Sequence, residues 1–251
     1  MVRLNAMAPA LSFLAALCLW QAAVMLGHVP VYLVPGPIAI VQAFAADAPG
    51  LLRALVATLS VTFAALLLAV VLGVAMACAM ASSRWARAAI EPWAVILQVT
   101  PVVAIAPLII IWIGDPFAAM VVCATVVAFF PVFSNTVAGL AATPPDLLDL
   151  FRLNGASRLH EVFWLRLPAA LPFFLAGLRV SGGLALVGAV VAEFVTGAGG
   201  VASGLAFRIL EAGYRLQIAR MFAALALLSA AGLAINAVLG WVSGKLLARS
   251  T

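Results

Sequence analysis

The chain has 251 residues, of which 67% are hydrophobic and only 8% are charged, and its net charge is +5. Such a composition leaves too few polar side chains to cover the surface of a soluble domain, so it predicts a membrane protein built from helices. The basic balance could indicate nucleic-acid binding, but sparse arginines on one side of a membrane explain it better.

Six apolar runs have about the length that a lipid bilayer requires, so we expect one all-α membrane domain over residues 1–251 with six spans. These runs lie at about residues 9–26, 55–80, 93–113, 117–138, 173–195 and 221–242. The first run could pass for a signal peptide, but no small-residue cleavage site follows it and further spans do. We therefore interpret it as an uncleaved anchor.

The longest charged stretch, residues 142–172, separates the fourth run from the fifth and is called the central segment below. Thr143 followed three residues later by Asp146 predicts a helix start with Thr143 as its N-cap. Gly155 provides the backbone freedom that ends such a helix, and Ser157 can cap a second one. The segment is therefore expected to form two short helices joined by a tight turn.

Each of these helices would have an apolar side, and Pro168 and Pro172 would end the second one. The sides consist of Leu147, Leu150 and Phe151 in the first helix, and of Leu159, Val162 and Phe163 in the second. A merely solvated loop explains the polar composition about equally well. The paired caps and the apolar sides instead favour a surface that contacts another molecule.

The central segment resembles the cytoplasmic loop of permease subunits of binding-protein-dependent ABC importers, which is written E-A-A-x3-G-x9-I-x-L-P. Gly155 matches the glycine, Leu165 to Pro168 match I-x-L-P, and Asp149 takes the acidic position. The departures are Asp for Glu, Leu150 and Phe151 for the two alanines, and Leu for Ile. The spacing from the glycine to the proline is unchanged.

This resemblance implies a type I importer-like fold in which the central segment is a coupling helix that fits a groove on a separate ATPase. The ATPase-coupling residues would be Asp149, Leu150, Phe151, Arg152, Gly155, Ala156, Ser157, Arg158, Leu165, Leu167 and Pro168. The implied partners are a cytoplasmic ABC ATPase dimer, a second copy of this chain, and a periplasmic or lipid-anchored solute-binding protein. ATP and Mg²⁺ would belong to the ATPase, so this chain is expected to be no enzyme and to bind no cofactor.

Short sequence motifs along the whole chain resemble those of one branch of this family, the permeases for nitrate, sulfonates, taurine and thiamine-precursor pyrimidines. The resemblance rests on VPVYLVPGP, TPVVAIAPLIIIWIG, AFFPVF and AVVAEF. Within the branch, VAIAPL and FFP are closest to the members that carry thiamine precursors and related small heterocycles. A small polar solute of this range is expected.

Polar side chains within the apolar runs are the other candidates for function, because burying them in lipid is costly. The possible translocation path consists of Gln98, Thr100, Ser134, Asn135 and Glu193. Hydrogen bonding between helices explains the uncharged ones equally well, and a structural role for Glu193 and Arg179 is favoured. No cluster of residues suggests a metal site.

Lysines and arginines favour one orientation, with both termini and the central segment in the cytoplasm of a cell with an inner membrane. That side would hold eight of them, and the other side four: Arg3, Arg84, Arg87, Arg152, Arg158, Arg166, Lys245 and Arg249, against Arg53, Arg208, Arg215 and Arg220. No G-x-x-x-x-G-K-[ST] loop occurs. An ion-coupled secondary transporter and, less favoured, a polytopic membrane enzyme remain alternatives.

Overall fold

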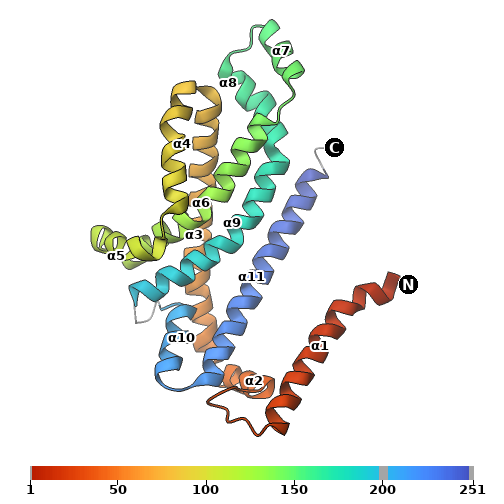
Figure 1. Ribbon diagram of the computed structural model, residues 1–251, viewed down its shortest axis with the longest axis vertical. Coiled ribbons are helices and arrows are strands. Elements are labelled where there is room, and N and C mark those ends of the chain that lie inside the picture. Colours follow the sequence, from red (N-terminus) through yellow and green to blue (C-terminus); the bar gives the residue numbers. More distant parts are fainter. Residues whose placement is uncertain (1, 198–202, 249–251) are drawn as a thin grey trace. The chain divides into compact units, whose positions relative to one another are not determined.

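The computed structural model describes residues 2–197 and 203–248, without the side chains of residues 2–7, 9 and 10. The predicted orientation also used Arg249, which lies outside these residues, and the side chain of Arg3, which is not described. The described chain is helical and contains no strand (Figure 1). Its elements are α1 Val2–Leu26, α2 Pro37–Ala46, α3 Ala48–Ser82, α4 Arg84–Val99, α5 Val102–Ile113, α6 Pro116–Ala141, α7 Pro145–Leu153, α8 Arg158–His160, the π-helix η1 Glu161–Arg166, α9 Leu167–Thr196, α10 Leu205–Tyr214 and α11 Ile218–Leu247.

Four of the described helices are long and apolar enough to cross a membrane: α3, α6, α9 and α11. A fifth span results if α4 and α5 are counted together, although their axes are bent by 106°. The expected third span, residues 93–113, is thus a broken pair, because Thr100 and Pro101 interrupt the helix. The first expected span falls in α1, whose part Leu11–Leu26 is a shorter apolar helix.

The described residues divide into two compact units, residues 2–57 with 203–230 and residues 58–197 with 231–248. In the first unit, a small core forms around Leu51 of α3, Leu205 of α10 and Ala224 of α11. Asp47 and Arg220 form an ion pair, so the end of α2 is fixed to the start of α11. The side chain of Gln21 in α1 accepts a hydrogen bond from the backbone N–H of Ile38 at 3.2 Å.

The first unit also has a charged cluster on α10. Arg208 and Arg215 each contact the carboxylate of Glu211 at 2.9 Å. The hydrogen bond from Arg208 is the main reason why the pKa of Glu211 lies below its ordinary value, and the charges of Arg215, Arg208 and Arg220 lower it further. Glu211 is therefore ionised at neutral pH.

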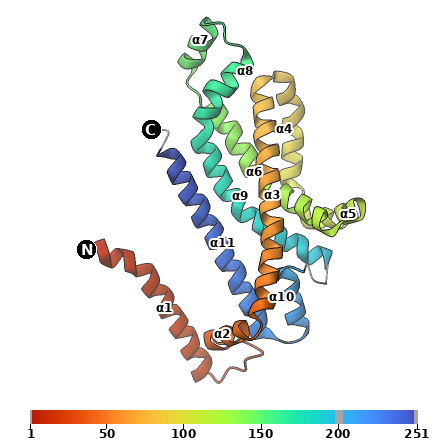
Figure 2. The same ribbon diagram turned by 180° about the vertical axis from the view of Figure 1, so that it is seen from behind.

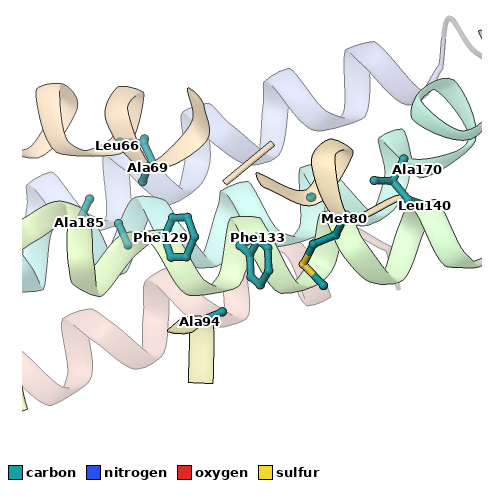
Figure 3. Close-up of a cluster of buried hydrophobic side chains, with 11 residues drawn as sticks. Leu66, Ala69, Met80, Ala94, Phe129, Phe133, Leu140, Ala170 and Ala185 are labelled. Atoms are coloured by element: carbon teal, nitrogen blue, oxygen red, sulfur yellow. The ribbon is translucent and has the colours of Figure 1, made fainter. Parts of the chain in front are cut away.

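The core of the second unit lies where α3, α6 and α9 meet (Figure 3). Phe129 and Phe133 of α6 stack one turn apart, with ring centroids 5.3 Å from each other. Around them Figure 3 shows Leu66 of α3, Ala94 of α4 and Ala185 of α9, all buried. The core is rich in alanine, which lets the helix backbones approach closely.

Glycines on α9 make its contact with α6 especially close. A Cβ atom at Gly177 would lie 2.5 Å from the carbonyl oxygen of Pro131, and one at Gly188 would lie 2.8 Å from the Cα of Ala124. Ser181 adds a buried hydrogen bond, donating from Oγ to the carbonyl of Ala128 at 2.6 Å. The glycines of α9 thus permit close helix packing.

Candidate functional site

The turn between α7 and α8 forms as the sequence predicts. Gly155 has φ +75°, and its N–H donates to the carbonyl of Arg152 at 2.9 Å, which ends α7. The Ser157 hydroxyl then accepts a hydrogen bond from the N–H of His160 at 3.3 Å, so Ser157 is the N-cap of α8. Both turn residues therefore have the predicted roles.

The predicted cap at Thr143 is wrong. Helix α7 begins at Pro145, and Pro144 stands at its N-cap without a side-chain hydrogen bond. Thr143 is buried, and its hydroxyl donates to the carbonyl of Leu140 at 3.3 Å. The last carbonyls of a helix need donors, so Thr143 serves the end of α6 and not the start of α7.

The predicted end of the second helix at Pro168 is also wrong, because α8, η1 and α9 follow one another without a break. The N–H of Leu167 donates to the carbonyl of Val162, five residues back, as in a π-helix. Pro168 comes directly after this wider turn, and Pro172, the other predicted end, lies inside α9. The central segment thus connects rigidly to a membrane-spanning helix.

The apolar sides predicted for the two helices differ in burial. On α7, Leu147 and Leu150 are exposed, and Leu153 is 86% exposed. In the second helix Val162 is buried, whereas Leu159 and Phe163 are exposed. The three side chains predicted to share one side of the second helix therefore have different surroundings.

Glu161 joins the parts of the central segment. It is only 4% exposed, and it accepts hydrogen bonds from Arg152 Nε at 3.1 Å and Arg166 Nη2 at 3.3 Å. Arg152 also contacts Asp149 at 3.3 Å. Our sequence reasoning missed Glu161 as a site residue, because in an α-helix partners lie three or four residues apart and Arg166 is five residues away. The π-turn brings the two together.

Two of the five candidate path residues line a common cavity. A hollow of about 430 Å³ in the second unit lies among α4, α5, α6 and α9, and Gln98 and Thr100 face it. Its other described lining residues are apolar or glycine and proline, including Phe130, Pro131 and Val191. The break between α4 and α5 is what places the two polar residues there.

The other three candidates do not line this cavity. Asn135 donates from Nδ2 to the carbonyl of Pro131 at 2.9 Å, and Ser134 is half-buried on the same helix. Glu193 is buried and accepts a 2.7 Å hydrogen bond from the hydroxyl of Thr58 on α3. Arg179 donates from Nε to Asn236 of α11 at 3.0 Å. The contacts of Glu193 and Arg179 connect helices, which is the structural alternative, whereas the contact of Asn135 stays within α6.

No group of three His, Cys, Asp or Glu side chains within residues 2–197 and 203–248 is placed to hold a metal ion. The chemistry of the site is therefore that of ion pairs, exposed leucines and a largely apolar cavity.

Comparison with known proteins gives a consistent picture. Residues 69–248 match the family described as "Binding-protein-dependent transport system inner membrane component". A "Probable ABC transporter permease protein" of Haemophilus influenzae is 35% identical over 96% of this chain and 97% of its own length. The riboflavin transport system permease protein of Chloroflexus aurantiacus is 42% identical over 72% of this chain and 68% of its own.

A solved structure supports the fold. The crystal structure of an amino acid ABC transporter with histidines superposes with a TM-score of 0.66 at 18% identity, over 83% of this chain and 97% of that one. At that identity the likeness concerns the fold alone, and it confirms the predicted all-α, type I importer-like architecture.

Proposed function

Because the chain belongs to the family of inner membrane components of binding-protein-dependent transport systems, we propose that its central segment is the surface through which a separate ATPase moves the membrane-spanning helices. The chain is a multi-pass membrane protein and the permease subunit of an ABC importer. The coupling role of residues 142–172 goes beyond family membership and is supported by the contacts of this segment.

Exposed leucines on α7 support a protein partner at this surface. Leu147, Leu150 and Leu153 are exposed on a helix that also carries three charged side chains. Three leucines on one nine-residue helix would gain from burial in a groove, because each buried leucine contributes about 2 kcal/mol. On a surface that stayed in water, these leucines would contribute no burial energy.

The observation that carries the proposal is the continuous helical path from Arg158 to Thr196. Glu161 ties α7 to this path through Arg152, so a displacement of α7 is transmitted to η1 and then to α9. Helix α9 in turn packs on α6 and contributes Leu184, Val187 and Val191 to the cavity. Movement of the central segment would thereby change the cavity.

The assembly we propose has two copies of this permease, two cytoplasmic ABC ATPase chains and a periplasmic or lipid-anchored solute-binding protein. ATP and Mg²⁺ would be bound by the ATPase chains, whose closure would bring the two central segments together and open the spans outward. Hydrolysis would reset them. Both termini and the central segment would lie in the cytoplasm, in the inner membrane of the cell.

The cavity suits a neutral solute with an apolar face. Gln98 and Thr100 are the only described side chains lining it that carry polar groups, and no charged side chain does. A nitrate or sulfonate anion would lose its hydration there without gaining a cation. We propose that a small heterocycle, of the pyrimidine or thiamine-precursor kind, is carried in preference to nitrate, sulfonates or taurine. Uptake of a labelled pyrimidine and of nitrate by the reconstituted complex would distinguish the two.

The coupling role is tested with Leu153→Asp. A charge in place of this exposed leucine should weaken co-purification of the ATPase about tenfold and reduce ATP-driven uptake in proteoliposomes, because the apolar contact is lost and a carboxylate would have to be buried in its place. The control is Leu216→Asp, an equally exposed leucine in the turn before α11, which should leave both unchanged. If Leu153→Asp retained full ATPase binding and uptake, the coupling role would be wrong.

A further inference from the structure

Five arginines and one carboxylate line a cleft of about 650 Å³ in the second unit. The arginines come from two separate parts of the chain. They are Arg84 and Arg87 on α4, and Arg152, Arg158 and Arg166 in the central segment, and the carboxylate is Glu161 of that segment. Figures 1 and 2 both show the turn between α3 and α4 beside α8, at one end of this unit.

The charges in this cleft are not balanced. Five positive groups and one negative group line it, a net charge of +4, and Glu161 is already engaged by Arg152 and Arg166. Among the described residues, Arg84, Arg87 and Arg158 form no ion pair. The Nε atom of Arg166 is buried and has no hydrogen-bond partner among the described atoms. Positive charges without partners, together with a buried N–H donor that lacks an acceptor, favour the binding of an anion in this concave site.

Guanidinium groups select among anions. Each presents several N–H donors in a plane, a geometry that matches the oxygens of a phosphate group. Several arginines that converge on one cleft can share a single phosphate. A chloride ion would use few of these donors, so the donor set fits a phosphate group better than a simple halide.

Exposed tryptophans place the cleft at the depth of lipid headgroups. Trp85, next to Arg84, is 87% exposed, and Trp164, two residues before Arg166, is 74% exposed. Tryptophan is enriched at the boundary between membrane and water. Helix α9, which follows Trp164, contains a candidate span, and helix α4, which contains Trp85, is one half of the bent pair that could form another.

We propose that this cleft binds a phosphate group, and that in the membrane the phosphate belongs to the headgroup of an anionic phospholipid. A bound phosphate would connect Arg84 and Arg87 to the arginines of the central segment. An anionic lipid would thereby hold the turn between α3 and α4 in contact with the central segment, which is proposed to receive the ATPase. The site itself does not depend on that proposed role.

The test uses the full-length purified protein and two lipids, phosphatidylglycerol and phosphatidylcholine, with bound lipid measured by native mass spectrometry. The variant Arg84→Gln/Arg87→Gln removes two cations and leaves both partners of Glu161 in place. It should bind phosphatidylglycerol roughly thirtyfold more weakly, since each surface arginine contributes about a factor of five. The control Arg53→Gln/Arg215→Gln removes the same charge outside the cleft and should bind like the unaltered protein.

A parallel titration with inorganic phosphate, followed by thermal unfolding, distinguishes the source of the phosphate. A preference for phosphatidylglycerol that is lost only in the cleft variant supports the headgroup. Stabilisation by inorganic phosphate without a lipid preference, lost in the same variant, supports the site with a soluble phosphate as its occupant.

Two results overturn the proposal. One is equal binding of both lipids to the unaltered protein together with no effect of phosphate. The other is an equal loss in the cleft variant and the control. The comparison of the two lipids and of phosphate on the unaltered protein remains decisive even if the cleft variant assembles poorly.

Discussion

The central segment and the α6–α9 pair are held together by different physical means. In the central segment, the buried carboxylate of Glu161 joins α7 to η1 through Arg152 and Arg166. Most apolar side chains of the segment face outward. Between α6 and α9 the contact depends on the absence of side chains at Gly177 and Gly188. The first region depends on charge and the second on backbone proximity.

This difference fits the work each region is proposed to do. A segment that must hold its shape in water and present leucines to a partner cannot use those leucines for its own core. A helix pair inside a membrane gains little from the hydrophobic effect, because lipid is as apolar as leucine, and it relies on close packing instead. Removing a charged side chain should therefore destabilise the central segment, and adding a methyl group should destabilise the α6–α9 contact.

The largest effect is expected for Glu161→Ala. Removing the carboxylate leaves Arg166 largely buried and unpaired, and should destabilise the central segment by about 3 kcal/mol, at the low end for a buried ion pair because Arg152 stays hydrated. Amide hydrogen exchange of residues 145–166 measures this loss. The control Asp149→Ala removes an exposed partner of Arg152 and should cost about 0.5 kcal/mol. Equal costs would mean that Glu161 is not the connecting residue.

Gly177→Ala should follow, with a loss of about 2 kcal/mol in the free energy of unfolding, because the new methyl group meets the Pro131 backbone. Gly183 lies on the same helix with nothing within 4 Å of an added Cβ. Gly183→Ala should be neutral or stabilising by up to about 1 kcal/mol through helix propensity. Unfolding in detergent compares the two, and similar losses at both positions would contradict the packing argument.

Gly155→Ala should cost about 1 kcal/mol of local stability in the central segment, because alanine resists a left-handed backbone. Gly155→Asn should cost less, since asparagine tolerates that conformation better. Both changes leave the Glu161 ion pairs in place, so they measure the contribution of the turn to stability separately from that of the ion pairs. Hydrogen exchange at residues 152–158 measures the effect, and an asparagine variant as unstable as the alanine variant would argue against it.

The smallest effect concerns Glu211 in the first unit, whose pKa is depressed mainly by Arg208. Its carboxylate stabilises the fold at pH values above its ordinary pKa of 4.5, and this contribution is lost as the pH falls through the depressed value. Glu211→Gln should therefore lower the Tm slightly at neutral pH, and the difference should vanish in acid. A difference that grows on acidification would reverse the assigned sign.

Much of the fold could be predicted from the sequence, because apolar runs, glycine turns and serine caps act locally. Gly155 and Ser157 have the predicted roles, and the family and the all-α fold are confirmed. Pro101 stands at the break between α4 and α5, whereas Pro107 lies inside α5. The angle of 106° between α4 and α5 could not be predicted, because it depends on the helices packed around the break.

The candidate site was predicted less completely, and the reason is tertiary context. Gln98 and Thr100 line the cavity because the α4–α5 break positions them there. Glu193 looked equally suitable by residue type, but its partner Thr58 is 135 residues away in the sequence. Asn135 instead bonds to the carbonyl of Pro131, four residues back on its own helix. The coupling residues as a set remain a prediction.

The π-turn at Glu161–Arg166 also fixes a rotational phase. Each residue of a helix rotates the chain by about 100°, and the five-residue hydrogen bond from Leu167 to Val162 accommodates one residue more than an α-helix would. Deleting a single residue there would restore ordinary helix and leave α7 and α8 close to their present phase relative to α9, because the wider turn already accommodates the extra residue. A deletion in the regular α-helix that follows has no such compensation, and it would turn the exposed leucines of α7 by about 100° relative to the rest of α9.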